Sequence, residues 1–86
     1  MNSNYICPCC GFYTFVTKPK GEYDICPVCF WEDDPFQSQD PNLEGGANSV
    51  SLNQARINYK KFGACEENMI QFVRPPKENE FKGLDD

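Results

Sequence analysis

The pattern of apolar and polar residues predicts two short strands in the N-terminal third of the chain. Residues 12–16 are all aromatic or β-branched, which is typical of a strand. Residues 22–25 are predicted to return as a second strand, and the intervening residues 18–21 contain the proline and glycine of a turn. We therefore expect the two segments to pair as a β-hairpin, which would be only marginally stable in water on its own.

The clearest helical pattern covers residues 51–62. Apolar side chains recur there on one face of a helix, at Leu52, Ala55, Tyr59 and Phe62. Ser51, with Gln54 three residues later, is a capping-box pattern, and Gly63 suits the position just beyond the C-terminal end. The sequence predicts one main helix here, with its apolar face directed toward the core.

The remaining segments have less regular patterns. Residues 32–48 contain two prolines and two glycines and predict an extended, solvated acidic loop. Residues 65–73 predict a second short helix or turn, which Pro75-Pro76 ends. Its apolar side chains fall on one side: Cys65, Met69, Phe72 and Val73. Residues 75–86 are polar and acidic and predict a frayed tail.

Two Cys-Pro-x-Cys turns supply the strongest chemical signal in the chain. The first pairs Cys7 with Cys10 and the second pairs Cys26 with Cys29, with fifteen residues between the pairs. This spacing matches a zinc site with four thiolate ligands. In a chain of 86 residues such a metal also stabilises a core that is small by itself. We therefore predict Zn²⁺ bound by these four cysteines in a zinc ribbon with rubredoxin-like turns.

The two turns differ at the residue that follows the second cysteine. Gly11 follows the first turn and permits the positive φ that closes such a turn. Phe30 occupies the equivalent position after the second turn. The second turn is therefore expected to close differently or to carry strain.

The cysteines also have other uses. Six cysteines allow 15 disulfide connectivities. The N-terminal residues have no signal-peptide pattern, however, so we expect a reducing, cytoplasmic environment where structural disulfides are rare. A thioredoxin-like motif requires a βαβ pattern, which neither pair has. Iron is the further alternative, because four thiolates also hold iron in rubredoxin-like one-electron carriers, although rubredoxins space their turns further apart.

The absence of histidine limits the chemistry of the chain. It excludes His-containing metal sites and His-dependent triads. A zinc ion with four thiolate ligands has no open position, so we expect a structural, non-catalytic site. Cys9 and Cys65 remain outside this ligand set. They permit a second hypothesis, a thiol-based redox sensor or enzyme, whereas a buried inert thiol is the simpler interpretation.

The net charge of −5 is unevenly distributed. Residues 32–48 hold five acidic residues and no basic one, and three of them form the cluster Glu32-Asp33-Asp34. This segment predicts a basic protein partner or, as a sharper hypothesis, a divalent-metal site, although it does not match the EF-hand pattern. Two polar residues point away from the apolar face of the predicted helix and are available to a partner: Asn53 and Arg56.

Two classes of partner are not expected. Nucleic-acid binding requires a basic stripe that neutralises phosphates, and the chain has none beyond a small basic patch on the predicted helix. No segment approaches the roughly 18 apolar residues of a membrane-spanning helix. The partner that we expect is therefore a protein.

Several longer motifs carry a family resemblance. They are Cys7-Pro8-Cys9-Cys10-Gly11, Tyr23-Asp24-Ile25-Cys26-Pro27-Val28-Cys29-Phe30-Trp31-Glu32-Asp33-Asp34-Pro35, Glu44-Gly45-Gly46-Ala47-Asn48, Ser51-Leu52-Asn53-Gln54-Ala55-Arg56 and Phe62-Gly63-Ala64-Cys65. Over roughly residues 5–75 the chain resembles the bacterial cysteine-rich CPCC family. The resemblance implies a small zinc-binding domain and implies no particular activity.

Together these patterns predict a small α+β protein that forms one domain over residues 1–86. Its expected parts are a zinc ribbon (4–31), an acidic loop (32–48), a helical part (51–74) and a polar tail (75–86). The predicted function is a non-catalytic zinc-binding module that mediates a protein–protein interaction. The alternatives are an iron-containing electron carrier and a thiol-based redox sensor or enzyme that uses Cys9 or Cys65.

Overall fold

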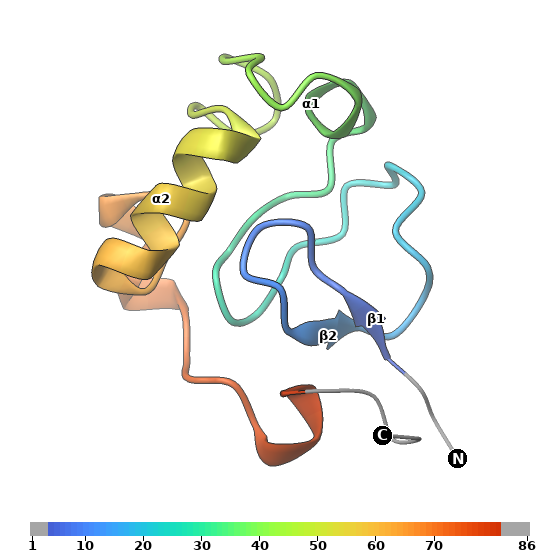
Figure 1. Cartoon of the computed structure of the whole chain (residues 1–86), viewed down its shortest axis with the longest axis vertical. Coiled ribbons are helices and arrows are strands. Elements are labelled where there is room, and N and C mark those ends of the chain that lie inside the picture. Colours follow the sequence, from blue (N-terminus) through green and yellow to red (C-terminus); the bar gives the residue numbers. More distant parts are fainter. Residues whose placement is uncertain (1–3, 82–86) are drawn as a thin grey trace.

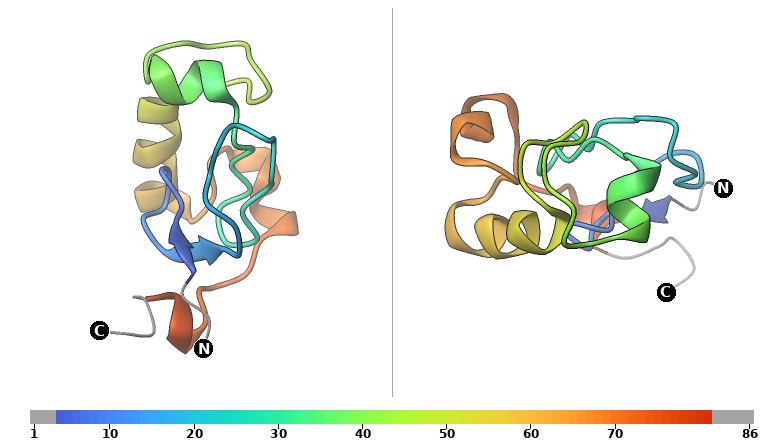
Figure 2. Two further views of the ribbon diagram at one scale, coloured as in Figure 1. Left: turned by 90° about the vertical axis from the view of Figure 1, so that its right-hand side faces the viewer. Right: turned by 90° about the horizontal axis from the view of Figure 1, so that it is seen from above.

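The computed structural model describes residues 4–81, which contain two short strands, two α-helices and two 3₁₀-helices (Figure 1). In chain order these are β1 (Tyr5–Ile6), β2 (Tyr13–Phe15), α1 (Pro35–Gln39), α2 (Leu52–Phe62), η1 (Glu67–Phe72) and η2 (Glu78–Glu80). The strands precede all the helices along the chain, which agrees with the predicted small α+β class. In Figures 1 and 2, α2 lies on one side of the two cysteine-containing turns and the loop over residues 18–22 lies on the other.

The β-hairpin is formed by different segments from those predicted. β1 pairs antiparallel with β2, joining Tyr5 to Phe15 and Ile6 to Tyr13. Of the predicted second strand, only Ile25 makes a bridge, and its partner is Glu32. The predicted pairing of residues 12–16 with residues 22–25 is therefore wrong. The physical reason is that each cysteine turn itself reverses the chain, so each flank pairs with the other flank of the same turn over the shorter loop.

The acidic segment is only partly the solvated loop that the sequence predicted: residues 42–47 are exposed and lie outside any helix or strand, whereas residues 33–39 are folded. It contains α1, whose N-cap is Asp34 and whose first residue is Pro35. The carboxylate of Asp34 accepts the N–H groups of Phe36 and Gln37 at 2.8 and 3.4 Å. Asp33 and Asp34 are only 2% and 4% exposed. The carboxylates of Asp33 and Asp34 are therefore buried and do not face solvent.

Gln37 of α1 is the centre of a buried polar network. Its side chain is 0% exposed, and its Nε2 donates to the carbonyl oxygens of Leu43, Asn48 and Val50 at 3.0, 3.1 and 3.0 Å. Its Oε1 accepts from the backbone N–H and the Nδ2 of Asn48. Asn48 in turn bonds to both the N–H and the carbonyl of Glu32. These bonds fix the loop over residues 43–50 against the chain that leaves the second cysteine turn.

The predicted main helix is confirmed as α2. Ser51 is its N-cap, and the Ser51 hydroxyl accepts the N–H of Gln54 at 3.1 Å. The other half of the predicted capping box is absent, because the side chain of Gln54 donates to Asn58 instead. Gly63 ends the helix with φ 85°, a left-handed conformation that glycine adopts without a steric penalty. Leu52 and Ala55, on the predicted apolar face, are buried in the core.

Removal of the cap of α2 is expected to destabilise the protein moderately. Ser51→Ala deletes the hydroxyl that satisfies the N–H of Gln54, so the free energy of unfolding should fall by about 0.5–2 kcal/mol. Urea titration measures this change, and Ser49→Ala, at an exposed position just before the helix, serves as the control. An unchanged midpoint for Ser51→Ala would show that the hydroxyl does not stabilise the helix.

The predicted second short helix is the 3₁₀-helix η1, and its predicted apolar side is only partly correct. Cys65 is 1% exposed and Met69 packs against the core. Phe72, however, is 59% exposed and stacks on Phe30, with ring centroids 5.4 Å apart. A 3₁₀-helix has three residues per turn, so its side chains follow a different stripe from that of an α-helix.

Residues 75–81 are folded, which contradicts the predicted frayed tail for this part; residues 82–86 lie outside the described residues. Glu80 of η2 is 5% exposed and accepts two hydrogen bonds from the guanidinium of Arg74, both at 2.9 Å. The ring of Phe81 packs edge-on against Phe12, with centroids 5.2 Å apart. The segment therefore packs against the hairpin at β2.

The ion pair between Arg74 and Glu80 predicts an acid-dependent loss of stability. The hydrogen bonds from Arg74 lower the pKa of Glu80. A carboxylate whose pKa is lowered by folding stabilises the protein above its unfolded pKa of about 4.3, and this contribution disappears as the pH falls through the folded pKa. Glu80→Gln should thus lower the free energy of unfolding by about 1–2 kcal/mol at neutral pH and by progressively less below about pH 4. The effect is modest because the side chain of Arg74 is partly exposed.

Urea unfolding of Glu80→Gln and wild type across this pH range measures the difference directly. Glu78→Gln, at an exposed position of the same 3₁₀-helix, is the matched control and should follow wild type at every pH. A difference between Glu80→Gln and wild type that stays constant down to pH 3.5 would contradict the assignment.

Candidate metal centre

The sulfurs of Cys7, Cys10, Cys26 and Cys29 all lie within 4.8 Å of one another. The sulfurs of Cys7 and Cys29 are 3.6 Å apart, and those of Cys10 and Cys26 are 3.8 Å apart. All four cysteines are free thiols rather than disulfides. Four sulfurs bound to one zinc ion at about 2.3 Å in a tetrahedron are about 3.8 Å apart. The arrangement therefore fits a tetrahedral metal ion.

The two cysteine turns, residues 7–11 and 26–30, repeat the same backbone hydrogen bonds. The N–H of the first cysteine donates to the carbonyl of the residue five positions later, from Cys7 to Phe12 at 2.8 Å and from Cys26 to Trp31 at 2.9 Å. The carbonyl of the first cysteine accepts the N–H of the residue four positions later, which is Gly11 or Phe30, at 2.9 and 2.8 Å. Each turn thus orients its two sulfurs without help from the other.

Phe30 adopts the same left-handed conformation as Gly11, with φ 70° against 81°. Of the two alternatives predicted for the second turn, different closure or strain, the structure shows strain, as a positive φ at a bulky residue. Such a conformation costs a non-glycine residue about 1–2 kcal/mol. The stacking of Phe30 on Phe72 offsets part of this cost.

The surroundings of Cys26 stabilise its thiolate. The hydroxyl of Thr14 lies 3.1 Å from its sulfur, and the N–H of Val28 donates to it at 3.4 Å. Hydrogen bonds from the neighbouring thiols Cys10, Cys29 and Cys7 lower the pKa of Cys26. The thiols of Cys10 and Cys26 conversely raise the pKa of Cys7. One thiolate therefore forms easily, and further ones require a cation that balances their charge.

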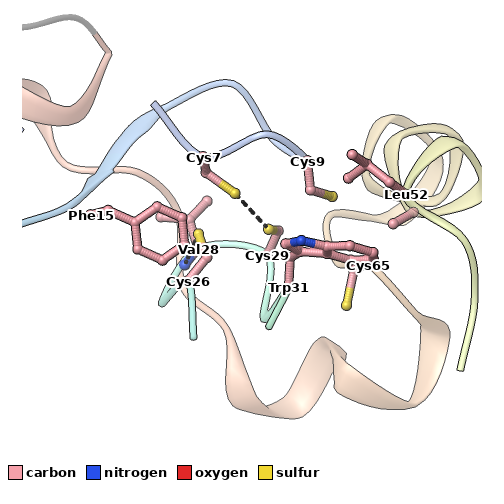
Figure 3. Packing of buried hydrophobic residues seen from close by; sticks show 10 residues of the cluster. Cys7, Cys9, Phe15, Cys26, Val28, Cys29, Trp31, Leu52 and Cys65 are labelled. Carbon is pink, nitrogen blue, oxygen red and sulfur yellow. Dashed lines mark hydrogen bonds between the residues drawn. The ribbon is translucent and has the colours of Figure 1, made fainter. Parts of the chain in front are cut away.

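Burial makes the cluster a closed site. Cys7, Cys26 and Cys29 are 0% exposed, and of the four only Cys10 is partly exposed. Trp31 is also 0% exposed, and its indole nitrogen is the one buried side-chain nitrogen or oxygen of residues 4–81 without a hydrogen-bond partner. Figure 3 shows this nitrogen on the side of the ring that points toward the sulfur of Cys29. An indole N–H can only donate, so an anionic sulfur suits it better than a neutral thiol.

Cys9 and Cys65 do not belong to the four-sulfur cluster. Both are buried, at 7% and 1% exposure. Burial, together with the nearby Cys9, raises the pKa of Cys65 to about 12. A thiol with such a pKa is protonated at neutral pH and a poor nucleophile. Cys65 instead serves the second cysteine turn through its backbone, since its N–H donates to the carbonyl of Cys29 at 2.8 Å.

The helix also contributes a contact to the first cysteine turn that the sequence did not predict. The Nε of Arg56 donates to the carbonyl of Pro8 at 2.9 Å, and its Nη1 donates to Asn53. Arg56 is exposed, in agreement with the prediction that it points away from the apolar face of the helix, but its Nε is already bound to the first cysteine turn. No local signal could have found this contact, because 48 positions separate its partners.

The acidic cluster Glu32-Asp33-Asp34 does not form a metal site. Within residues 4–81 the four cysteines are the one group of three or more potential ligands close enough to share an ion. Asp33 accepts the N–H of Gly21 at 2.8 Å, and Asp34 accepts that of Ala47 at 2.9 Å in addition to capping α1. Burial alone would raise the pKa of Asp34, but its backbone hydrogen bonds lower it overall. These two carboxylates are structural.

The fold and the site define a small α+β protein with a buried four-cysteine cluster that could hold a metal ion. The model of the family described as cysteine-rich CPCC matches residues 5–80, and the chain belongs to this family. A search of curated proteins finds no match to the chain. No helix within residues 4–81 has the length and apolar character needed to cross a membrane.

Proposed function

We propose that the protein is a non-catalytic zinc-binding module of the zinc-ribbon type that mediates a protein–protein interaction. The observation that carries the metal part is the tetrahedral spacing of the sulfurs of Cys7, Cys10, Cys26 and Cys29. Four thiolates complete the coordination of zinc and leave no position for water or substrate. The metal would therefore hold the two cysteine turns together and supply folding free energy rather than chemistry.

Zinc is proposed over iron because the sequence spacing of the turns matches zinc ribbons. A thiol-based redox function receives no support from Cys65, whose raised pKa and burial disfavour reaction. A protein partner is proposed because the site is closed and the chain carries a net charge of −5, which disfavours nucleic acid. The charge of that partner no longer follows from the acidic segment, since Asp33 and Asp34 are bound internally.

Elemental analysis tests the metal. Protein produced without a tag, in medium that contains both zinc and iron, should carry one zinc per chain and be colourless. A strong chelator should remove the zinc and unfold the protein, because the apo chain loses its metal-binding energy. Stoichiometric iron with the red colour of ferric thiolate, or protein that is folded without any metal, would contradict the proposal.

A further inference from the structure

A mostly apolar groove of about 600 Å³ runs beside β1, between the first cysteine turn, the loop over residues 18–21 and the start of α1. Its apolar walls are Tyr5, Ile6, Pro8, Tyr13, Pro19 and Pro35. Tyr5 and Ile6 are 42% and 49% exposed although both belong to a strand. An apolar surface of this kind next to a strand is typical of a binding site rather than of random exposure.

The strand beside this groove has an unpaired edge. Within residues 4–81, β1 pairs with β2 and with no other strand. The second edge of this two-residue strand therefore has no strand partner among these residues. An extended peptide can add a strand to such an edge, with main-chain bonds for affinity and side-chain pockets for specificity.

The rim of the groove is positively charged although the chain as a whole is acidic. Lys18 and Lys20 both lie on the rim and are exposed. Neither is paired with a carboxylate of residues 4–81, where Arg74 and Glu80 form the one ion pair. The carboxylate that lines the groove, Asp33, is 2% exposed and already accepts the N–H of Gly21. Glu22 lines the adjoining hollow, together with Lys18 and Lys20, and does not line the groove itself.

We propose that this groove binds an extended peptide of a partner protein, in which an acidic side chain stands next to β-branched or aromatic ones. The peptide would pair with the free edge of β1, place its apolar side chains against Tyr5 and Ile6, and direct its carboxylate to Lys18 and Lys20. The inference rests on the proposed function as a protein-interaction module and names the chemistry of the partner. The acidic segment predicted a basic partner, whereas the groove predicts an acidic one.

Selection from a phage-displayed library of random dodecapeptides, against full-length zinc-loaded protein, tests this inference. The enriched peptides should share an acidic residue beside β-branched or aromatic residues. In fluorescence anisotropy the labelled consensus peptide should bind the double variant Lys18→Glu/Lys20→Glu at least about tenfold more weakly than wild type. Glu22→Gln, the matched control, should bind equally or more tightly. Amide shifts in NMR should map to Tyr5, Ile6 and residues 18–21.

The inference would be overturned by no enrichment, by a basic consensus, by binding that Lys18→Glu/Lys20→Glu leaves unchanged, or by shifts that map elsewhere. Dimerisation of the chain that Ile6→Asp abolishes would also overturn it, because a second copy would then occupy the groove. The zinc content of every variant separates this inference from the proposed function. If zinc-loaded protein selects no peptide, only the peptide-binding inference is contradicted. If the protein contains no metal and still selects the peptide, the proposed zinc site is contradicted.

Discussion

Cys26→Ala is expected to abolish stoichiometric metal binding and the cooperative thermal transition. The sulfur of Cys26 lies in the four-cysteine cluster, 3.1 Å from the hydroxyl of Thr14, and accepts the N–H of Val28. A site of three thiolates loses affinity, and in small zinc-dependent peptides about 10–16 kcal/mol of apparent metal-binding free energy is also folding free energy. Zinc content and thermal melting measure both losses in one preparation. Alanine variants of Cys7, Cys10 and Cys29 should behave in the same way.

The two remaining cysteines provide matched controls for this prediction. Cys65→Ala should keep its zinc and lose only about 1–3 kcal/mol of stability, the cost of a small cavity. Cys9→Ala should keep its zinc and lose less. Alanine is the better replacement at Cys65, because serine would bury a hydroxyl. Loss of zinc from Cys9→Ala, together with its retention by Cys7→Ala or Cys10→Ala, would show that the ligand set is wrong.

Gln37→Leu is expected to lower the free energy of unfolding by about 3–5 kcal/mol without loss of zinc. Leucine nearly fills the volume of Gln37 but leaves three carbonyl oxygens and two N–H donors without partners in a buried site. Each unsatisfied buried group costs about 1–3 kcal/mol, and relaxation recovers part of the sum. Urea titration of the zinc-loaded protein measures the change.

Gln39→Leu, in the same helix α1 but at an exposed position, is the control and should change stability by no more than about 0.5 kcal/mol. Equal stabilities for Gln37→Leu and Gln39→Leu would mean that the polar network contributes nothing to the fold. Loss of zinc from Gln37→Leu would mean that the loop over residues 43–50 is coupled to the metal centre.

The features that the sequence predicted correctly depend on local signals. The spacing of the cysteines identified the four sulfurs that the structure brings together. The start and end of α2 followed from Ser51 and Gly63, whose roles involve only neighbouring residues. Helix α1 also had a local signal, because Asp34 before Pro35 is a cap followed by a favoured first residue. It was missed because the acidic and proline-containing context suggested a loop.

The features that the sequence did not predict depend on distant partners. Tyr5 and Ile6 were not recognised as a strand, since two residues show no alternation and their partner follows a turn. Residues 75–81 have a polar pattern, yet the contact of Arg74 with Glu80 and the N–H bond from Arg74 to Pro27 hold them in place. At the candidate metal centre, the contact of Arg56 with Pro8 likewise depends on a distant partner that no periodicity encodes.

The repetition of the two cysteine turns has a consequence for how the chain would acquire the proposed metal ion. Because Gly11 and Phe30 each close a turn through local bonds, either turn can present two sulfurs before the other has formed. Once one turn has bound the ion with its two sulfurs, binding by the second pair of sulfurs is an intramolecular step. The effective concentration of the second pair is then on the order of millimolar, as for other short tethers. The ion would leave only when both cysteine turns open at the same time. Its exchange with solution should therefore be slower than its dissociation from a single turn.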